Sequence, residues 1–419
     1  MSEMPAPRVR PLQLAFVSPS WPVGAAPNGI VTYVSAAVEG LRALGHRPCI
    51  LTNVAPGCSP DADVYPLNPA KRSLRSKLLD GFTFRINPLA ALRSRDSANI
   101  VRAGRRVIAE RGVELLEMEE TFGLAQLVKR SLPIPIVVQI HGPFFVNGAC
   151  AGLLEKPGTQ QRLKNEGIAI SQADGITAPS QDILDRTRAY YQLPLAGAIV
   201  APPPAPAVAH HQRWRLTDCD RNATLFVGRF DRHKGGDIVI DAFRRLAPRF
   251  PHLRLWCVGD DRGFVDDGGK EWTLREYIAA KAPEVAERID VFGRIPTSDL
   301  ERLRSRAYCT MIASRYENFP SVVLEALAFG CPTVATRTGG IPEIVEDGVN
   351  GLLCLPGDSE VLSAALGRLL SDSSLAARLG ERAREDVARR YDPIRHAQRK
   401  AEFYLEVIER HSARRRPKA

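Results

Sequence analysis

The chain has 419 residues, of which 44% are hydrophobic and 25% charged, and its 57 Lys and Arg against 47 Asp and Glu give a formal net charge of +10. This length and apolar content are enough for at least two folded domains and exclude a globally disordered chain. No stretch approaches the roughly 18 to 20 apolar residues of a membrane-spanning helix, and the N-terminal residues do not resemble a secretion signal. We therefore expect a soluble, cytoplasmic protein.

Short apolar runs alternate with helical stripes along the first half of the chain. This alternation is typical of an α/β domain built on a parallel sheet. A helix follows the first strand, with its apolar stripe at Ile30, Val34, Val38 and Leu41. The predicted strands span 12–17, 47–52, 113–118, 135–140 and 175–180.

Residues 71–111 form a basic segment with eleven basic and three acidic side chains, a local excess of +8. Apolar residues lie among these charges, as in an amphipathic segment that contacts an anionic membrane or an anionic acceptor. The alternative is a solvated helical face over an ordinary core. No RNA- or DNA-binding motif accompanies the charge, so no nucleic-acid partner is expected.

A proline-rich stretch at 204–220 predicts a stiff linker, and the strand–helix alternation resumes after it. We therefore expect one domain at 1–203, a second at 221–392 and a final helix at 393–411. In doubly wound sheets, ligands bind at the carboxyl ends of the strands, so a cleft between the two domains is the expected site.

The eight cysteines contain no C-x-x-C pair and have no histidine at metal-ligand spacing. They are expected to be mostly buried, reduced thiols, and no metal site is predicted.

Two glutamates, Glu317 and Glu325, flank a predicted helix start at which Ser321 is the expected N-cap. Backbone N–H groups at a helix start favour an anion such as a diphosphate. Glu317 on the loop can accept hydrogen bonds from sugar hydroxyls, and Glu325 from the two hydroxyls of a ribose. Without further context, the two residues are equally consistent with solvated helix acids.

Two basic residues lie where a strand of the second domain passes into its helix. Arg229 follows the strand that ends near Val227-Gly228, and Lys234 stands at the start of the next helix. A guanidinium offers forked donors and an ammonium a compact charge, so together they suit the two phosphates of a nucleotide sugar.

With the segment CPTVATRTGGIPEIVEDGVNGLL at 331–353, these motifs resemble the retaining glycosyltransferases of family 4. Other parts of the chain match in order: 19–44 is similar to the family's N-terminal loop and helix, His141-Gly142 to its strand-end histidine, and 317–325 to its E-x7-E motif. The resemblance implies an α/β GT-B fold, in which two Rossmann-like doubly wound domains face a central cleft. The first domain would bind the acceptor and be completed by the C-terminal helix, and the second would bind the donor.

The resemblance also implies residue roles. Arg229 and Lys234 would stabilise the departing diphosphate without a metal ion or another cofactor, Glu325 would hold the ribose, and Glu317 would hold the transferred sugar. His141 would lie beside the reacting centre. The donor side would further include Gly29, Gly228, Arg294, Ile295, Asn318, Phe319, Pro320, Val322 and Val323, and the acceptor side Glu119, Glu120 and Phe144.

Two positions depart from the family pattern. Asn318 and Pro320 stand where many members have glycine, which stiffens the loop and narrows the choice of sugar. Asn28 stands before Gly29 where two glycines are common.

The activity implied is transfer of a hexosyl unit, with net retention, from a UDP- or GDP-linked sugar to a hydroxyl of a saccharide, lipid-linked or small-molecule acceptor. Two alternatives stay open: a non-catalytic sugar-nucleotide-binding subunit, and a synthase or phosphorylase of the same fold. If the basic segment binds anionic lipid, the protein is peripheral at the inner face of the cell membrane.

Overall fold

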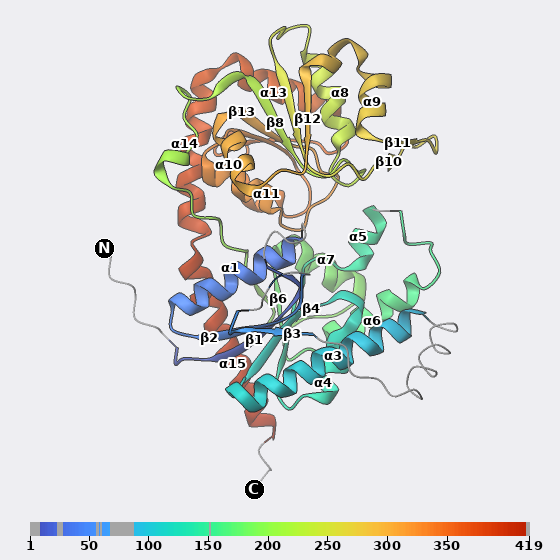
Figure 1. Cartoon of the computed structure of the whole chain (residues 1–419), viewed down its shortest axis with the longest axis vertical. Helices are drawn as coiled ribbons and strands as arrows, with labels where there is room; N and C mark the ends of the chain where they lie inside the picture. Colours follow the sequence, from blue (N-terminus) through green and yellow to red (C-terminus); the bar gives the residue numbers. More distant parts are fainter. Residues whose placement is uncertain are drawn as a thin grey trace. The chain divides into compact units, whose positions relative to one another are not determined.

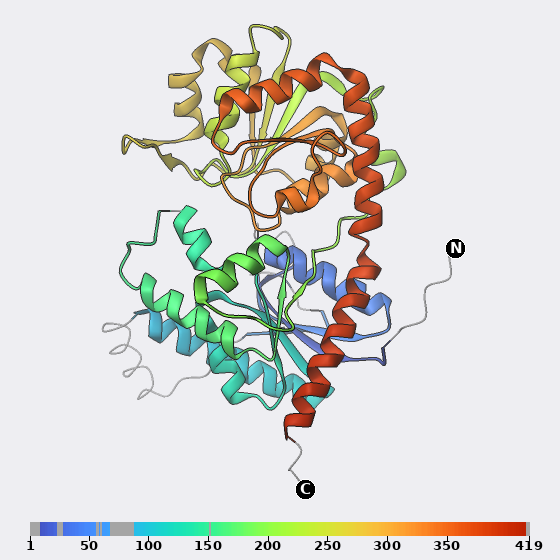
Figure 2. The same ribbon diagram turned by 180° about the vertical axis from the view of Figure 1, so that it is seen from behind.

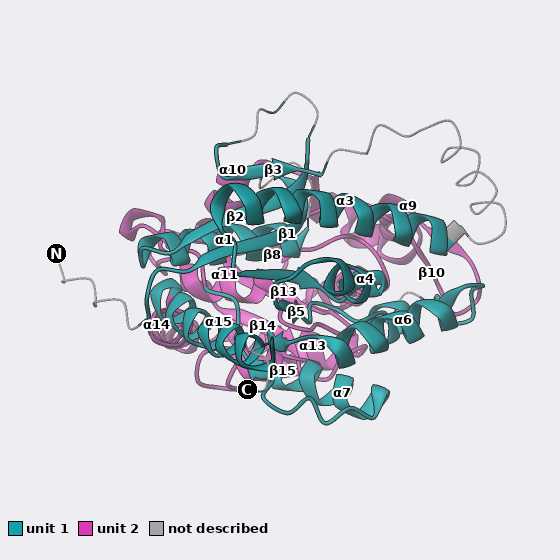
Figure 3. Ribbon diagram, turned by 90° about the horizontal axis from the view of Figure 1, so that it is seen from below, with its two compact units in different colours: residues 1–204, 393–419 teal, residues 205–392 magenta. Residues whose placement is uncertain are grey.

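The computed structural model describes residues 9–22, 28–55, 58, 61–67, 88–150 and 152–415. The chain folds into two compact units, unit 1 (residues 1–204 and 393–419) and unit 2 (residues 205–392), which Figure 3 shows in different colours. Each unit has a parallel sheet flanked by helices (Figure 1). The predicted class, two Rossmann-like α/β domains, is confirmed.

Unit 1 contains a seven-stranded sheet of order β3-β2-β1-β4-β5-β6-β7, all of whose neighbouring strands are parallel. This order is the one of a doubly wound fold, with its switch point between β1 and β4. The strands are β1 Gln13–Trp21, β2 Arg47–Val54, β3 Val64–Pro66, β4 Leu115–Glu119, β5 Ile136–Gln139, β6 Gly175–Ala178 and β7 Ile199–Val200. The helices are α1 Gly29–Ala43, α3 Pro88–Arg111, α4 Leu124–Ser131, α5 Phe144–Cys150, α6 Thr159–Gln172, α7 Gln181–Tyr191 and α15 Pro393–Arg415, with a short 3-10 turn at Thr121–Gly123.

The C-terminal helix α15 belongs to unit 1, where it packs against α1 (Figure 2). The close approach depends on Gly40 of α1, because a Cβ there would lie 3.0 Å from the carbonyl oxygen of Pro393. Side chains of α15, including Phe403, Tyr404 and Val407, join the core that β1 and α1 form. The last helix therefore completes the core of the first unit.

Unit 2 contains a six-stranded parallel sheet of order β12-β9-β8-β13-β14-β15 and a small antiparallel hairpin, β10-β11. Its strands are β8 Asp220–Val227, β9 Arg254–Val258, β10 Phe264–Val265, β11 Glu271–Trp272, β12 Ile289–Gly293, β13 Ala307–Ile312, β14 Thr333–Thr336 and β15 Leu352–Cys354. Its helices are α8 Gly236–Leu246, α9 Leu274–Lys281, α10 Thr297–Arg306, α11 Ser321–Phe329, α12 Ile341–Ile344, α13 Ser359–Ser371 and α14 Ser373–Arg390, with 3-10 turns at His210–Gln212 and Pro283–Arg288.

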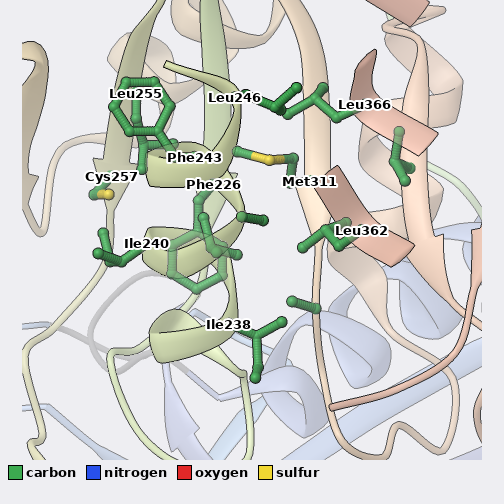
Figure 4. Close-up of a cluster of buried hydrophobic side chains, with 14 of the residues drawn as sticks. Phe226, Ile238, Ile240, Phe243, Leu246, Leu255, Cys257, Met311, Leu362 and Leu366 are labelled. Carbon is green, nitrogen blue, oxygen red and sulfur yellow. The ribbon is translucent and has the colours of Figure 1, made fainter. Parts of the chain in front are cut away.

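The main core of unit 2 is built around α8. Figure 4 shows its apolar side chains, among them Phe243 and Leu246, beside Met311 of β13 and Leu366 of α13. Burial of these side chains fixes the start of α8 against the end of β8.

The proline-rich stretch at 204–220 packs against unit 2. Ala205 donates its N–H to the carbonyl of Tyr391 at 2.9 Å, and the buried Trp214 donates its indole N–H to the carbonyl of Ala307 at 2.8 Å. The burial of Trp214 anchors this stretch in unit 2, which begins at Ala205.

The expectation that Ser321 caps α11 is wrong. Pro320 is the N-cap and Ser321 the first helical residue, and no side chain caps this helix. Proline already holds φ near the value that a helix start requires, at −75° here, and the helix begins one residue earlier than an N-cap at Ser321 would give.

Residues 88–111 of the basic segment form helix α3, whereas 71–87 lie outside the described residues. Among the residues that the structure describes, no helix is long and apolar enough to cross a membrane. All eight cysteines are free thiols; Cys49, Cys257, Cys309, Cys331 and Cys354 are buried, and Cys58 is exposed.

Candidate functional site

The turn between β8 and α8 brings Arg229 and Lys234 to the carboxyl edge of the unit 2 sheet. Gly235 adopts a left-handed φ of +67°, and a Cβ there would lie 2.1 Å from the carbonyl oxygen of Ala313, so only glycine fits. Asp231 shapes the turn, since its carboxylate accepts the backbone N–H of Lys234 at 2.8 Å and pairs with the Arg229 guanidinium at 2.8 Å.

Gly228 begins this turn directly beside the neighbouring strand. A Cβ on Gly259 would lie 2.1 Å from the carbonyl oxygen of Gly228, so the backbones at the ends of β8 and β9 approach each other closely. The donor residues predicted at 228–234 are thus on one rigid turn.

Glu317 and Lys234 form an ion pair of 2.5 Å between the carboxylate Oε1 and the ammonium Nζ. β13 is parallel to β8 and adjacent to it, so the residues that follow both strands meet at one edge of the sheet. The hydroxyl of Ser314 donates to the same carboxylate oxygen at 2.7 Å. This pair joins two residues that the sequence placed 83 positions apart.

The charge state of Glu317 follows from these contacts. Burial by itself would raise the pKa of this carboxyl group, but the charges of Lys234 and His233 and the hydrogen bonds from Lys234 and Ser314 oppose it. The pKa of Glu317 is therefore below its ordinary value, and the group is an anion at neutral pH.

Glu325, in the first turns of α11, pairs through Oε2 with Arg304 of α10. The Arg304 side chain is only 3% exposed, and its Nε has no hydrogen-bond partner among the described residues. Because the buried guanidinium of Arg304 binds one carboxylate oxygen of Glu325, this contact fixes the orientation of the Glu325 side chain. The sequence did not indicate Arg304, because nothing in its spacing distinguishes it from the other charged residues of α10.

The loop before α11 is anchored by its aromatic residue. Phe319 packs edge-on against Tyr391, with ring centroids 5.7 Å apart, and Val323 is fully buried. Asn318 and Val322 are partly exposed on either side of the buried Pro320. The backbone of Glu317 contacts the turn at residues 338–340, because Gly340 donates its N–H to the Glu317 carbonyl at 2.8 Å.

The two residues predicted beside the nucleotide base follow β12. Arg294 is exposed, whereas Ile295 packs against a small cluster that includes Leu225 and Val258. Ile295 therefore contributes to the core of unit 2 as well as to its surface.

In unit 1, the predicted His141 follows β5, and Gly29 is the first residue of α1 after the N-cap Asn28. The ring of His141 lies edge-on to Tyr33 of α1, with centroids 4.8 Å apart. Desolvation, and then the charge of Lys400, lower the pKa of His141 to about 3, so its imidazole is neutral at physiological pH.

Glu119 is the last residue of β4 and Glu120 follows it, and the two have different surroundings. The buried Glu120 accepts the backbone N–H groups of His141 and Gly142 at 2.9 and 2.7 Å, so it holds the loop after β5. Glu119 is partly exposed. Burial, with a smaller contribution from the charge of the neighbouring Glu166, raises the pKa of Glu119 to about 7 and that of Glu120 to about 8.

The third acceptor-side prediction, Phe144, starts α5. Its N–H donates to Glu166 at 2.8 Å, and its ring lies 3.8 Å from the guanidinium of Arg162, which pairs with the same glutamate. Glu166 and Arg162 lie on α6, one helical turn apart, and the sequence patterns that predicted the acceptor side did not single them out.

A buried polar network lies beneath His141. Lys400 of α15 donates to Glu117 at 2.6 Å and to Gln139 and Thr177 at 3.1 Å each, while Tyr33 and Tyr404 donate to Glu117 at 2.7 Å. Lys400 and Glu117 are 1% and 2% exposed. The network ties α15 and α1 to three neighbouring strands of the sheet.

Within the described residues, no group of three or more His, Cys, Asp or Glu side chains is placed to hold a metal ion. Arg229 and Lys234 contribute positive charge at the carboxyl edge of the unit 2 sheet.

Comparison with known proteins identifies the family. Residues 27–205 match the model described as Glycosyltransferase Family 4, and residues 211–386 match the model described as Glycosyl transferases group 1. The chain belongs to glycosyltransferase family 4. The resemblance expected from the motifs is thus confirmed for the family and for the GT-B fold.

Known relatives agree with this assignment. A D-inositol 3-phosphate glycosyltransferase from Nocardiopsis dassonvillei is 29% identical over 265 residues, and the match covers 61% of this chain and 61% of that protein. The chain thus matches about three fifths of the length of this relative.

Two solved structures share the fold. The sucrose-phosphate synthase from Thermosynechococcus elongatus superimposes with a TM-score of 0.71 at 20% identity, covering 95% of this chain and all of that one. Anabaena HepE in complex with UDP-glucose superimposes with a TM-score of 0.66 at 17% identity, covering 94% of this chain and 99% of that one.

Proposed function

We propose that this family 4 glycosyltransferase moves a hexosyl unit from a nucleoside diphosphate sugar to a hydroxyl of a saccharide, lipid-linked or small-molecule acceptor, with net retention. The observation that carries the proposal is the Lys234–Glu317 ion pair, with Arg229 on the same turn, at the carboxyl edge of the unit 2 sheet. A cation and an anion at one edge suit a ligand that carries a diphosphate next to a polyhydroxylated ring.

In this proposal, Lys234 and Arg229 stabilise the leaving diphosphate. The Lys234 ammonium has three N–H donors and uses one for Glu317, so it can bind a phosphate oxygen without leaving its partner. The Arg229 guanidinium has five donors, of which Nε–H is engaged by Asp231. Positive charge fixed in advance stabilises the charge that develops as the sugar–phosphate bond breaks, and the proposal assigns this role to protein side chains without a cofactor.

Glu317 and Glu325 are proposed to hold the two sugars of the donor. The ionised Glu317 accepts hydrogen bonds from hydroxyls of the transferred hexose. Glu325 has one oxygen held by Arg304, and its other oxygen is proposed to accept a ribose hydroxyl. A UDP-linked donor is favoured, because UDP-glucose is the ligand in the HepE structure; a GDP-linked donor is the alternative.

The reaction follows from these roles. The acceptor oxygen forms a bond to the anomeric carbon on the face from which the diphosphate departs, and the bond from that carbon to the phosphate oxygen breaks. The leaving phosphate oxygen takes the acceptor proton, through an oxocarbenium-like transition state. Trapping a glycosyl adduct on Glu317 or any other side chain would refute this same-face route.

The acceptor is assigned to unit 1, where Glu119 is the last residue of β4 and Phe144 is the first residue of α5, the helix after β5. His141, neutral and packed on Tyr33, is proposed to lie beside the hexose.

The test is a thermal-shift and hydrolysis screen of the full chain against a panel of nucleoside diphosphate sugars, repeated with Lys234→Ala and Glu325→Ala. Arg302→Ala is the matched control, since it removes a positive charge from an exposed position of α10. We expect one donor to stabilise the wild-type protein and the control, and neither site variant. Binding without hydrolysis or transfer to any acceptor would indicate a non-catalytic subunit instead, and binding that survives both site substitutions would refute the site.

A further inference from the structure

Unit 1 has a concavity between helices α3 and α4. The proposed donor residues lie on the other unit, so this concavity is separate from them. It has a volume of about 520 Å³, which is within the usual range for small-molecule sites. Three arginines line it, Arg102 and Arg105 from α3 and Arg130 from α4, together with serines that include Ser94 and Ser131. No acidic residue is among the lining residues.

The acidic residues of α3 are paired with arginines that lie outside this pocket. Asp96 pairs with Arg95 at 3.2 Å, and Glu110 with Arg106 at 2.9 Å. Asp96 and Glu110 are thus engaged by arginines that do not line the pocket.

The neighbouring cations are held by other partners. Arg111 pairs with Asp63, and Lys129 pairs with Asp174 at 2.6 Å. Arg93 donates to the carbonyls of Phe122 and Gly123 at 2.9 Å each. Arg93, Arg111 and Lys129 thus have structural roles, whereas Arg105 and Arg130 line the pocket.

Within the described part of the chain, neither Arg105 nor Arg130 forms an ion pair. Arg105 makes a single long contact, 3.5 Å, to the carbonyl of Ser131. Burial lowers the pKa of Arg93, and the positive charge of Arg130 lowers it further, so the two guanidinium groups are close enough to interact. Two guanidinium groups from different helices therefore face one solvent-filled pocket with their donors in excess.

The pocket is built on a tight helix contact. A Cβ on Gly104 of α3 would lie 2.7 Å from a methyl carbon of Leu132, the residue that ends α4, so glycine allows the helices to approach here. Arg105 follows Gly104 directly, and Arg130 and Ser131 precede Leu132. The positions from which the arginines extend are thus set by packing.

We propose that this pocket binds a phosphate group, with Arg105 and Arg130 as its principal donors. Forked guanidinium donors match phosphate oxygens in geometry as well as in charge, and the hydroxyl of Ser94 adds a neutral donor. The phosphate has two possible sources, a soluble phosphorylated compound and the headgroup of an anionic lipid. Leu92 of α3 is 37% exposed, so it could contact the acyl chain of a lipid whose headgroup binds in the pocket. The inference does not depend on the proposed function.

The experiment compares two double variants of the full chain. Arg105→Gln/Arg130→Gln removes the pocket donors. Arg95→Gln/Arg106→Gln is the matched control, because it removes the same charge from exposed positions of α3 that lie outside the pocket. Pyrophosphate is titrated calorimetrically, and sedimentation is measured with phosphatidylcholine vesicles with and without phosphatidylglycerol, at low and raised salt.

We expect the pocket variant to bind the probe about tenfold or more weakly than the wild type, and the control to bind within about twofold of it. Lys234 and Arg229 can also bind pyrophosphate, so only the binding that is lost in the pocket variant and kept in the control assigns a soluble ligand to this pocket. Binding only to phosphatidylglycerol vesicles, released by salt, assigns a lipid headgroup. Equal losses in the two variants, or no binding of either probe by the wild-type protein, would overturn the proposal. Thermal shifts with the donor sugar should be the same in both variants, which separates this site from the donor site.

Discussion

Replacing Lys400 by methionine tests the buried network that joins α15 to the sheet of unit 1. The substitution keeps the length of the side chain and removes the ammonium, which bonds Glu117, Gln139 and Thr177. Glu117, 2% exposed, then keeps its two tyrosine donors but loses its counter-charge. Breaking such a buried pair from one side costs about 3 to 5 kcal/mol, because an uncompensated charge remains in the interior.

The assay is amide hydrogen exchange of peptides from α15 and β4, with peptides of unit 2 as the internal reference. Protection in α15 should fall roughly 10²- to 5 × 10³-fold near neutral pH. Adding Glu117→Gln should recover much of the loss, because it removes the unpaired charge. A loss below about tenfold, or one that Glu117→Gln does not reduce, would refute the reasoning.

Three further predictions concern other residues. The pKa of Glu120 is raised to about 8, so its contribution to the free energy of unfolding falls as pH rises from about 4.3 to about 8. The free energy of unfolding of the wild type, measured in urea, should therefore decrease relative to that of Glu120→Gln across this window. A constant difference between the two free energies would contradict the assignment. Gly235→Ala should lower the thermal midpoint by several degrees through a cost of about 2 kcal/mol or more, whereas Gly269→Ala, also at positive φ but with nothing within 4 Å, should cost about 1 kcal/mol; equal shifts would mean that the approach to Ala313 is unimportant. Donor hydrolysis should be unchanged after dialysis against EDTA if Lys234 supplies the charge on the diphosphate, and a loss that Mg²⁺ or Mn²⁺ restores would show that it does not.

Local patterns in the sequence predicted much of the fold. The strands at 12–17, 47–52, 113–118, 135–140 and 175–180 all exist as β1, β2, β4, β5 and β6, with ends shifted by a few residues. These strands are buried and bounded by turns, so their apolar runs are distinct. Helices α13 and α14 were not predicted, although each begins after an aspartate N-cap, at Asp358 and Asp372, that accepts two backbone N–H groups.

The sequence also placed Arg229 and Lys234 on one strand-to-helix turn, and Glu317 and Glu325 on the loop and helix that follow a later strand. Strand ends, turn glycines and helix starts are local features, so a linear pattern records them. Family membership followed from the same order of motifs.

Tertiary structure decided which of these residues meet and what supports them. The pairing of Lys234 with Glu317 depends on β13 lying next to β8, and strand order is not recorded in any single segment. Arg304 beneath Glu325 and Lys400 among the strands of unit 1 are charged residues that a pattern assigns to the surface, yet both are buried. They are stable inside because carboxylates far away in the sequence compensate their charge, and only the folded chain brings those partners together.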